Sequence, residues 1–257
     1  MTKRQTATLR SMRPSPPFWE VTLALEHPPD PGAYVLADLG GPVREALFPT
    51  AMDEHGFTTV LPPGHAATRL LPGAEVDVLG PLGRGFRLDR PGGSVVRLLL
   101  IAEVDQLPWL LPLTQMAPAV ALVIEATTRW RLPSPTQFPP ALELTLVTLD
   151  GSAGYLGPLE SGGSAPTGME RALGQIQELV VWADRICLAA ATERYSALAR
   201  LVRDARLQPQ ADFAQALVRV PMPCGVGVCD VCRVKTRHGE RRACVDGPVL
   251  DLMDFLP

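Results

Sequence analysis

The stretch "PCGVGVCDVCRVKTRHGERRACVDGPVLDL", residues 223–252, holds four of the five cysteines of the chain. They are Cys224, Cys229, Cys232 and Cys244, in the spacing C-x4-C-x2-C-x11-C. The first three follow a pattern typical of [2Fe–2S] ligands, in which one loop presents three thiolates and a fourth returns from further along the chain. Each of two irons needs two thiolates. We therefore predict that these four cysteines hold a binuclear iron–sulfur cluster.

Two glycines, Gly225 and Gly227, lie between the first two predicted ligands. Glycine permits positive φ and close approach of the backbone, so N–H groups in this loop can point at the sulfurs and tune the reduction potential. The alternative is a structural zinc site with four cysteines. Zinc ribbons usually use two C-x2-C knuckles, and here only Cys229 and Cys232 have that spacing. The fifth cysteine, Cys187, stands in an apolar run and is predicted to be a core residue.

Composition narrows the class of protein. A length of 257 residues suffices for two domains and a small appended module, and 46% hydrophobic residues predict an ordinary core. The formal net charge of −3 gives no reason to expect a nucleic-acid partner. No signal peptide and no run of about 20 apolar residues is apparent, so we expect a cytoplasmic protein without a membrane span. Thiols stay reduced in the cytoplasm, which favours a metal or redox centre over disulfides.

Residues 1–92 are rich in Pro and Gly and contain short alternating runs. Each run fits a strand between turn residues, and several short strands at this spacing predict a small antiparallel β-barrel. The predicted strands are "FWEVTLALEH" (18–27), "GAYVLADLG" (32–40), "FTTVLPP" (57–63) and "AEVDVLGPL" (74–82).

Residues 93–208 have a different pattern, in which continuous apolar strands alternate with helices. This order predicts an open, mostly parallel α/β sheet. Predicted strands cover 94–103, 119–127, 142–150 and 185–191, and predicted helices cover 107–116 (weakly), 169–183 and 192–207. Residues 209–257, opened by a short strand at 214–220, form the third and smallest part, the predicted cluster module.

The sequence resembles a known family, the electron transfer subunit of dihydroorotate dehydrogenase, in the ferredoxin-reductase superfamily. The resemblance rests on "CGVGVCDVC" and on Cys244 with "VDGPVLDL" after it. Upstream, "LLPGAEVDVLGPLGRGF" (70–86) is similar to the barrel-closing segment of that family. The resemblance implies a flavin-reductase-like barrel, a nucleotide domain, FAD, an NADH site and a [2Fe–2S] cluster that passes electrons to a partner in pyrimidine biosynthesis.

The chain departs from the flavin motif of that family, Arg-Pro-x-Ser on a barrel strand. The corresponding residues are "ALFPTAM" (46–52), with Phe48 and Ala51 where Arg and Ser are expected. Phenylalanine cannot replace a charge-assisted contact to phosphate. Arg44 or Arg69 could substitute, and "AATRLL" around Arg69 resembles a flavin-contacting segment of the family. FAD therefore stays an open alternative.

The chain departs further from the nucleotide motif. The family has a glycine-rich turn after the first strand of its nucleotide domain, which lets backbone amides approach a phosphate. Here side chains with Cβ atoms and two carboxylates take those places, so we do not expect NAD(P)H to bind. The residues at the glycine positions are Ile101, Ala102, Glu103 and Asp105, and "CLAAA" (187–191) replaces the Cys-Gly-Pro segment expected at the nicotinamide end.

Together these patterns predict an electron transfer subunit that is not catalytic alone and needs a catalytic oxidoreductase or dehydrogenase subunit as partner. Two alternatives stay open. The first is a relay or scaffold subunit that carries the cluster without flavin or NAD. The second is a zinc-stabilised interaction protein with no redox role.

Overall fold

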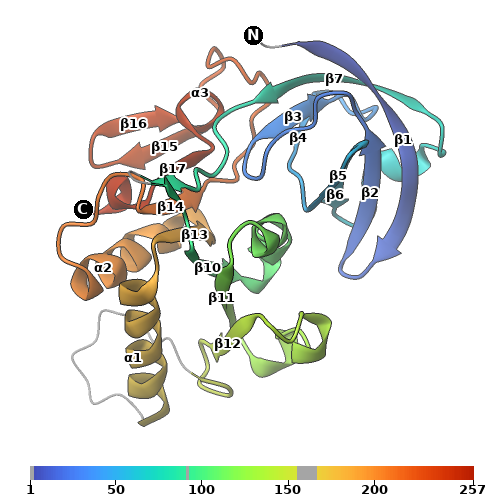
Figure 1. Ribbon diagram of the computed structural model, residues 1–257. Coiled ribbons are helices and arrows are strands. Elements are labelled where there is room, and N and C mark those ends of the chain that lie inside the picture. The colour runs from blue at the N-terminus through green and yellow to red at the C-terminus, as the bar shows by residue number, and fades with distance from the viewer. Residues whose placement is uncertain (1–2, 91–92, 155–166) are drawn as a thin grey trace. The chain divides into compact units, whose positions relative to one another are not determined.

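The computed structural model describes residues 3–90, 93–154 and 167–257, which fold into two compact units (Figure 1). The first unit comprises Met1–Phe86, Val218–Lys235 and Gly239–Val249. The second comprises Arg87–Leu217, Thr236–His238 and Leu250–Pro257. The cysteine stretch contributes to both units. The predicted boundaries of three parts, after residues 92 and 208, stay a prediction.

The first unit is built on a seven-stranded sheet in the order β4-β3-β7-β1-β2-β6-β5, with antiparallel neighbours throughout. This confirms the antiparallel architecture expected from the alternating runs. The side chains that point to one face of the strands, such as Leu9, Leu23 and Phe57, form the core. The strands are β1 (Arg4–Ser15), β2 (Phe18–Ala24), β3 (Tyr34–Ala37), β4 (Glu45–Leu47), β5 (Ala51–Asp53), β6 (Gly56–Leu61) and β7 (Glu75–Leu82), with a short 3-10 helix, η1 (Ala66–Arg69).

Strand β1 lies between β7 and β2 and was not predicted. Of its twelve residues only Ala7 and Leu9 are buried, because most of the strand carries polar side chains. Two buried positions, Ala7 and Leu9, are too few for an alternating apolar pattern that would distinguish a strand from a loop. The strand is instead defined by its backbone pairing with β7 and β2, which its side-chain pattern does not reveal.

The second unit contains a six-stranded sheet in the order β12-β11-β10-β13-β14-β17. Every pair from β12 to β14 is parallel, which confirms the predicted α/β architecture. Helices α1 and α2 pack against each other (Figure 1). The strands are β10 (Arg97–Glu103), β11 (Ala119–Ala126), β12 (Glu143–Thr148), β13 (Arg185–Ala189), β14 (Ala214–Leu217) and β17 (Val249–Asp251), and the helices are α1 (Thr167–Trp182) and α2 (Tyr195–Ala205).

The helix predicted weakly at 107–116 is replaced by two 3-10 helices, η2 (Val104–Trp109) and η3 (Leu111–Gln115). Pro108 lies inside η2 and another proline lies in the first turn of η3. Proline has no N–H to donate and clashes with the preceding turn, so these short helices cannot join into one α-helix. The other short elements are β8 (Asp89–Arg90), β9 (Gly93–Ser94), η4 (Arg129–Arg131), η5 (Pro135–Gln137), η6 (Thr192–Arg194) and η7 (Leu252–Phe255).

The cysteine stretch has little regular structure of its own. After β14 the chain runs through a loop to a two-stranded hairpin of β15 (Arg233–Thr236) and β16 (Gly239–Arg242). A single helical turn, α3 (Ala243–Asp246), follows the hairpin and carries the last cysteine. The amide of Ala243 donates to the carbonyl of Cys232 at 3.0 Å, which ties the start of this turn to the end of the loop.

Candidate metal centre

The four predicted ligands lie in two pairs. The Sγ atoms of Cys224 and Cys229 are 3.2 Å apart, and those of Cys232 and Cys244 are also 3.2 Å apart. A binuclear cluster needs two thiolates for each of its two irons, so this grouping fits the donor set of a [2Fe–2S] cluster. Over the ranges that the structure describes, no group of three or more His, Cys, Asp or Glu side chains is arranged around a single metal-ion position.

The backbone of the loop turns toward the sulfurs at the two predicted glycines. Gly225 has φ of +65° and Gly227 has φ of +77°, a region that side chains with a Cβ rarely adopt. A Cβ atom at Gly225 would also lie 2.7 Å from Cδ1 of Leu36 and 3.0 Å from Cδ1 of Leu82. The loop therefore packs directly on the sheet of the first unit, and only glycine fits at this contact.

Backbone N–H groups in the loop point at the first sulfur. Partial burial raises the pKa of Cys224, but hydrogen bonds from the amide of Val226 and from Cys229 and Val228 outweigh it and lower the pKa to about 6. Thiolate is the form that binds metal. These amides therefore favour the ligand state of the cysteine before any iron is bound.

The second pair lies deeper. Burial, followed by the neighbouring Cys232, raises the pKa of Cys244 to about 12. Proximity of a second thiol opposes the charge on the first, and a bound cation removes that opposition. Tyr34, fully buried in β3, donates from its hydroxyl to the carbonyl oxygen of Cys244 at 3.5 Å. Burial, and then the nearby cysteines, raise the pKa of Tyr34, so it stays a neutral donor.

Exposure differs among the ligands. Cys229 is exposed and Cys224 is partly exposed, whereas the second pair is buried. Four exposed valines, which we call the valine face, belong to the same segment. A Cβ at Gly227 would lie 2.8 Å from Cγ2 of Val245, which places that valine beside the loop. The valine face consists of Val226, Val228, Val231 and Val245.

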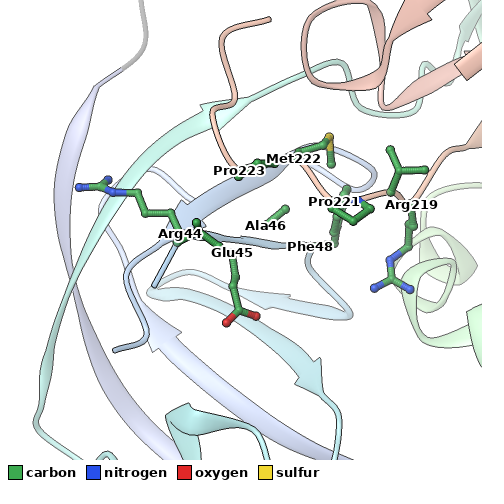
Figure 2. Close-up of a pocket in the computed structure, with 10 residues that line it drawn as sticks. Arg44, Glu45, Ala46, Phe48, Arg219, Pro221, Met222 and Pro223 are labelled. Atoms are coloured by element: carbon green, nitrogen blue, oxygen red, sulfur yellow. The ribbon is translucent and has the colours of Figure 1, made fainter. Parts of the chain in front are cut away.

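A cleft of about 480 Å³ lies in the first unit, directly before the first ligand in the chain. Figure 2 shows Phe48 next to Pro221, with Arg219 to the right of them and Met222 above. The guanidinium carbon of Arg219 is 5.7 Å from the centre of the Phe48 ring, within the range of a cation–π contact. The other lining residues are Val43, Arg44, Glu45, Ala46, Val220 and Pro223.

Sequence reasoning missed this use of Arg219. It offered Arg44 or Arg69 instead. Arg44 lines the cleft, whereas Arg69 is exposed at the end of η1 and is not one of the described residues that line it. The signal available in the sequence was proximity, because Arg219 stands five positions before Cys224. Its contact with Phe48, far away in the chain, appears only in the folded protein.

In the second unit, two carboxylates lie at the carboxyl ends of parallel strands. Glu103 ends β10 and stands opposite Glu125 of β11. Both oxygens of Glu125 accept from Nη2 of Arg194, at 2.8 and 2.9 Å. The amide of Ala191 donates to Glu103 at 2.8 Å. Burial raises the pKa of Glu125, and the positive charge of Arg194 opposes that rise.

This edge is where open α/β sheets bind their ligands. A dinucleotide site at this edge needs backbone amides that are free to donate to a phosphate, and it needs space for the phosphate to approach the backbone closely. Here the chain passes from β10 into η2 without a glycine, and an internal carboxylate already accepts the Ala191 amide. The residues present therefore do not fit a dinucleotide phosphate.

Comparison with known proteins first defines the class. Residues 221–255 match the family model of the iron–sulfur cluster binding domain of dihydroorotate dehydrogenase B. The fold is similar to that of the NADH-dependent reduced ferredoxin-NADP oxidoreductase, with a TM-score of 0.66 and 19% identity over 96% of this chain and 88% of that chain. It is also similar to a cytochrome P450 reductase from Amycolatopsis, with a TM-score of 0.58 and 17% identity over 84% of this chain and 69% of that one. The fold is ferredoxin-reductase-like.

Curated relatives then narrow the class. The chain is 26% identical over 186 residues to the electron transfer subunit of dihydroorotate dehydrogenase B (NAD(+)) of Desulforamulus reducens, covering 69% of this chain and 64% of that protein. It is also 26% identical over 231 residues to the probable counterpart of Thermoplasma acidophilum, covering 88% of this chain and 80% of that protein. The chain thus joins a dihydroorotate dehydrogenase B type cluster-binding domain to a ferredoxin-reductase-like fold. Among the described residues, no helix is long and apolar enough to cross a membrane.

Proposed function

We propose that this protein transfers electrons, as a subunit of a larger oxidoreductase, through a [2Fe–2S] cluster held by Cys224, Cys229, Cys232 and Cys244. The observation that carries the proposal is the arrangement of these thiols in two pairs with backbone amides directed at them. When bound, such a cluster accepts and releases one electron at a time and performs no substrate chemistry itself. A catalytic partner is therefore required for turnover, and a reducing compartment such as the cytoplasm suits the free thiols.

The partner that we propose is the catalytic dihydroorotate dehydrogenase subunit from the same source, by analogy with the relatives, which are electron transfer subunits. The valine face supports contact with a protein at this place. Exposed apolar side chains gathered at one site mark interaction surfaces, and these four valines belong to the same segment as the exposed ligand Cys229. Electrons pass most readily where two centres approach closely, so the exposed side of the cluster is the side that a partner must cover.

We expect Val228→Asp to weaken binding of that catalytic subunit by about tenfold or more, because a charge in an interface core must be desolvated. Val228 is the most exposed of the four valines, at 77%. Co-expression, followed by titration calorimetry of the purified subunits, measures the affinity. Addition of dihydroorotate to the anaerobic complex then shows whether the visible absorption of the cluster bleaches.

The matched control is Leu207→Asp, which changes an apolar residue of the second unit that is even more exposed, at 86%. It should leave the affinity within about twofold of wild type, as for ordinary surface substitutions. Equal weakening by both variants would contradict docking on the valine face. Failure of dihydroorotate to reduce the wild-type complex would contradict the choice of partner.

We further propose that the cleft beside Cys224 takes a flavin. A protein of similar fold, the ferredoxin reductase in carbazole 1,9a-dioxygenase, has a solved structure that is described as its FAD apo form (TM-score 0.54, 16% identity, covering 84% of this chain and 65% of that one). Phe48 supplies an aromatic surface, and Arg219 supplies a positive charge near the place of the missing motif arginine. A cluster-only relay without flavin is the alternative.

Replacing Arg219 with alanine is expected to lower the affinity for added FAD by about tenfold, as the loss of a charge-assisted contact would. Quenching of flavin fluorescence on titration with the anaerobic protein measures this affinity. Arg69→Ala is the companion variant, and it should bind FAD as wild type does. The reverse result would return the flavin role to Arg69, and a wild-type protein that binds no FAD would select the relay.

A further inference from the structure

Asp230 stands directly after the exposed ligand Cys229 and adopts φ of +56°. This left-handed conformation is uncommon outside glycine, although Asp and Asn tolerate it better than other residues do. The loop turns here from the first pair of ligands toward the second. A residue at this turn can therefore set how far the two pairs stand from each other.

The carboxylate of Asp230 bridges two arginines, with one oxygen for each. Nη2 of Arg233 donates to Oδ2 at 2.6 Å, and Nε of Arg242 donates to Oδ1 at 2.7 Å. Arg233 also donates to Glu240 on the neighbouring strand at 2.8 Å. Both ends of the hairpin formed by β15 and β16 are thus connected to the loop through a single carboxylate.

Arg242 links this network to the last ligand. Its backbone N–H donates to the carboxylate of Asp246 at 2.8 Å, across the helical turn α3 that carries Cys244. Its side chain reaches back to Asp230. One residue therefore holds the turn that bears Cys244 with its backbone and the loop that bears Cys229 with its side chain.

We propose that Asp230 is a positioning residue of the metal centre, which holds the Cys224/Cys229 pair at the correct distance from the Cys232/Cys244 pair by clamping Arg242 and Arg233. The members of each pair are 3.2 Å apart, but the first pair lies in the loop, whereas the second joins the end of the loop to α3. The Asp230 bridge is an ionic connection between these parts. Exposed ion pairs contribute little to global stability, so the clamp acts on local geometry.

The clamp makes a prediction that a simple charge effect does not. Asp230→Asn keeps a residue that tolerates the left-handed turn and removes the negative charge, and Arg242→Gln removes the positive charge. If only local charge mattered, these two variants would change cluster retention in opposite directions. If the clamp matters, both variants release the cluster faster, and the double variant is no faster than the quicker single one, because each breaks the same contact.

The measurement is the rate at which visible absorption is lost when the anaerobic protein is exposed to a chelator. We expect about fivefold faster loss in each single variant, consistent with an ion-pair network. Asp204→Asn, which breaks an exposed pair with Arg203 in α2, is the control and should match wild type. The EPR signal of the reduced protein should also change shape in Asp230→Asn, since the ligand geometry changes.

Loss of the cluster from Asp230→Asn at the rate of the control would overturn the clamp, and so would opposite effects of the two single variants. The inference rests on the proposed cluster but on no partner or flavin. A wild-type protein without iron would overturn the proposed function and this inference together. A wild-type protein with its cluster and an unchanged Asp230→Asn variant would overturn only the clamp.

Discussion

Cys232→Ser protein is expected to be purified without a stable cluster: colourless, nearly free of iron, and silent in EPR after reduction with dithionite. Cys232 is 1% exposed, and its Sγ lies 3.2 Å from that of Cys244. Serine at this buried position does not supply a thiolate, the ligand that iron–sulfur clusters require. Iron and sulfide analysis together with visible absorption measures the loss.

The control for this substitution is Cys187→Ala. Cys187 is fully buried in β13, and burial raises the pKa of its thiol, so it is a core residue and not a ligand. This variant should retain the iron content and EPR signal of wild type. Full iron content with an unchanged EPR signal in Cys232→Ser would contradict the ligand assignment. Wild-type protein with one zinc per chain and no EPR signal would instead establish the zinc alternative.

NADH is expected not to bleach the visible absorption of the anaerobic protein, whereas dithionite does. The carboxyl edge of the parallel sheet, where a nucleotide would bind, is occupied by Glu103, Glu125 and Arg194. A dinucleotide phosphate would meet two carboxylates there. It could not accept a hydrogen bond from the Ala191 amide, because that amide already donates to Glu103. Coulomb repulsion at this partly buried place is not screened as it would be in water.

The measurement is a spectrum after addition of excess NADH, repeated with NADPH and then with dithionite. Glu103→Gln serves as the companion variant: it removes one carboxylate but does not create a glycine turn, so it should behave as wild type does toward NADH. Rapid bleaching of wild-type protein by NADH would contradict this prediction. Electrons would then enter at the second unit, and the role assigned to its carboxylates would be wrong.

The sequence allowed much of the fold to be predicted, with particular limits. Continuous apolar runs identified β10, β11 and β13, because strands of a parallel sheet are covered on both faces. Strand β1 was missed, because its conformation is fixed by backbone pairing with β7 and β2 and not by an alternating pattern of its own side chains. The helix expected at 107–116 was wrong because prolines interrupt it.

The candidate site also has residues that could be predicted from the sequence and residues that could not. Ligand type and spacing are local, so the four cysteines and the two glycines of the loop could be named from the sequence. The cleft around Phe48 and Arg219 could not, because these residues are far apart in the chain and meet only through folding. The role of Asp230 was also missed, since a single aspartate in a loop is ordinary until its two arginine partners are placed.

What the sequence by itself determined is the chemistry available: four thiols at the spacing of a binuclear cluster, and a turn after β10 without the glycines that a phosphate needs. Only the tertiary structure decided how that chemistry is arranged. It joined the thiols in two pairs, left Cys229 exposed beside the valine face, and brought Arg194 to Glu125 across 69 positions of the chain. The reason is physical: residue type and spacing are covalent properties of a segment, whereas ion pairing, burial and exposure depend on segments that meet only when the core forms.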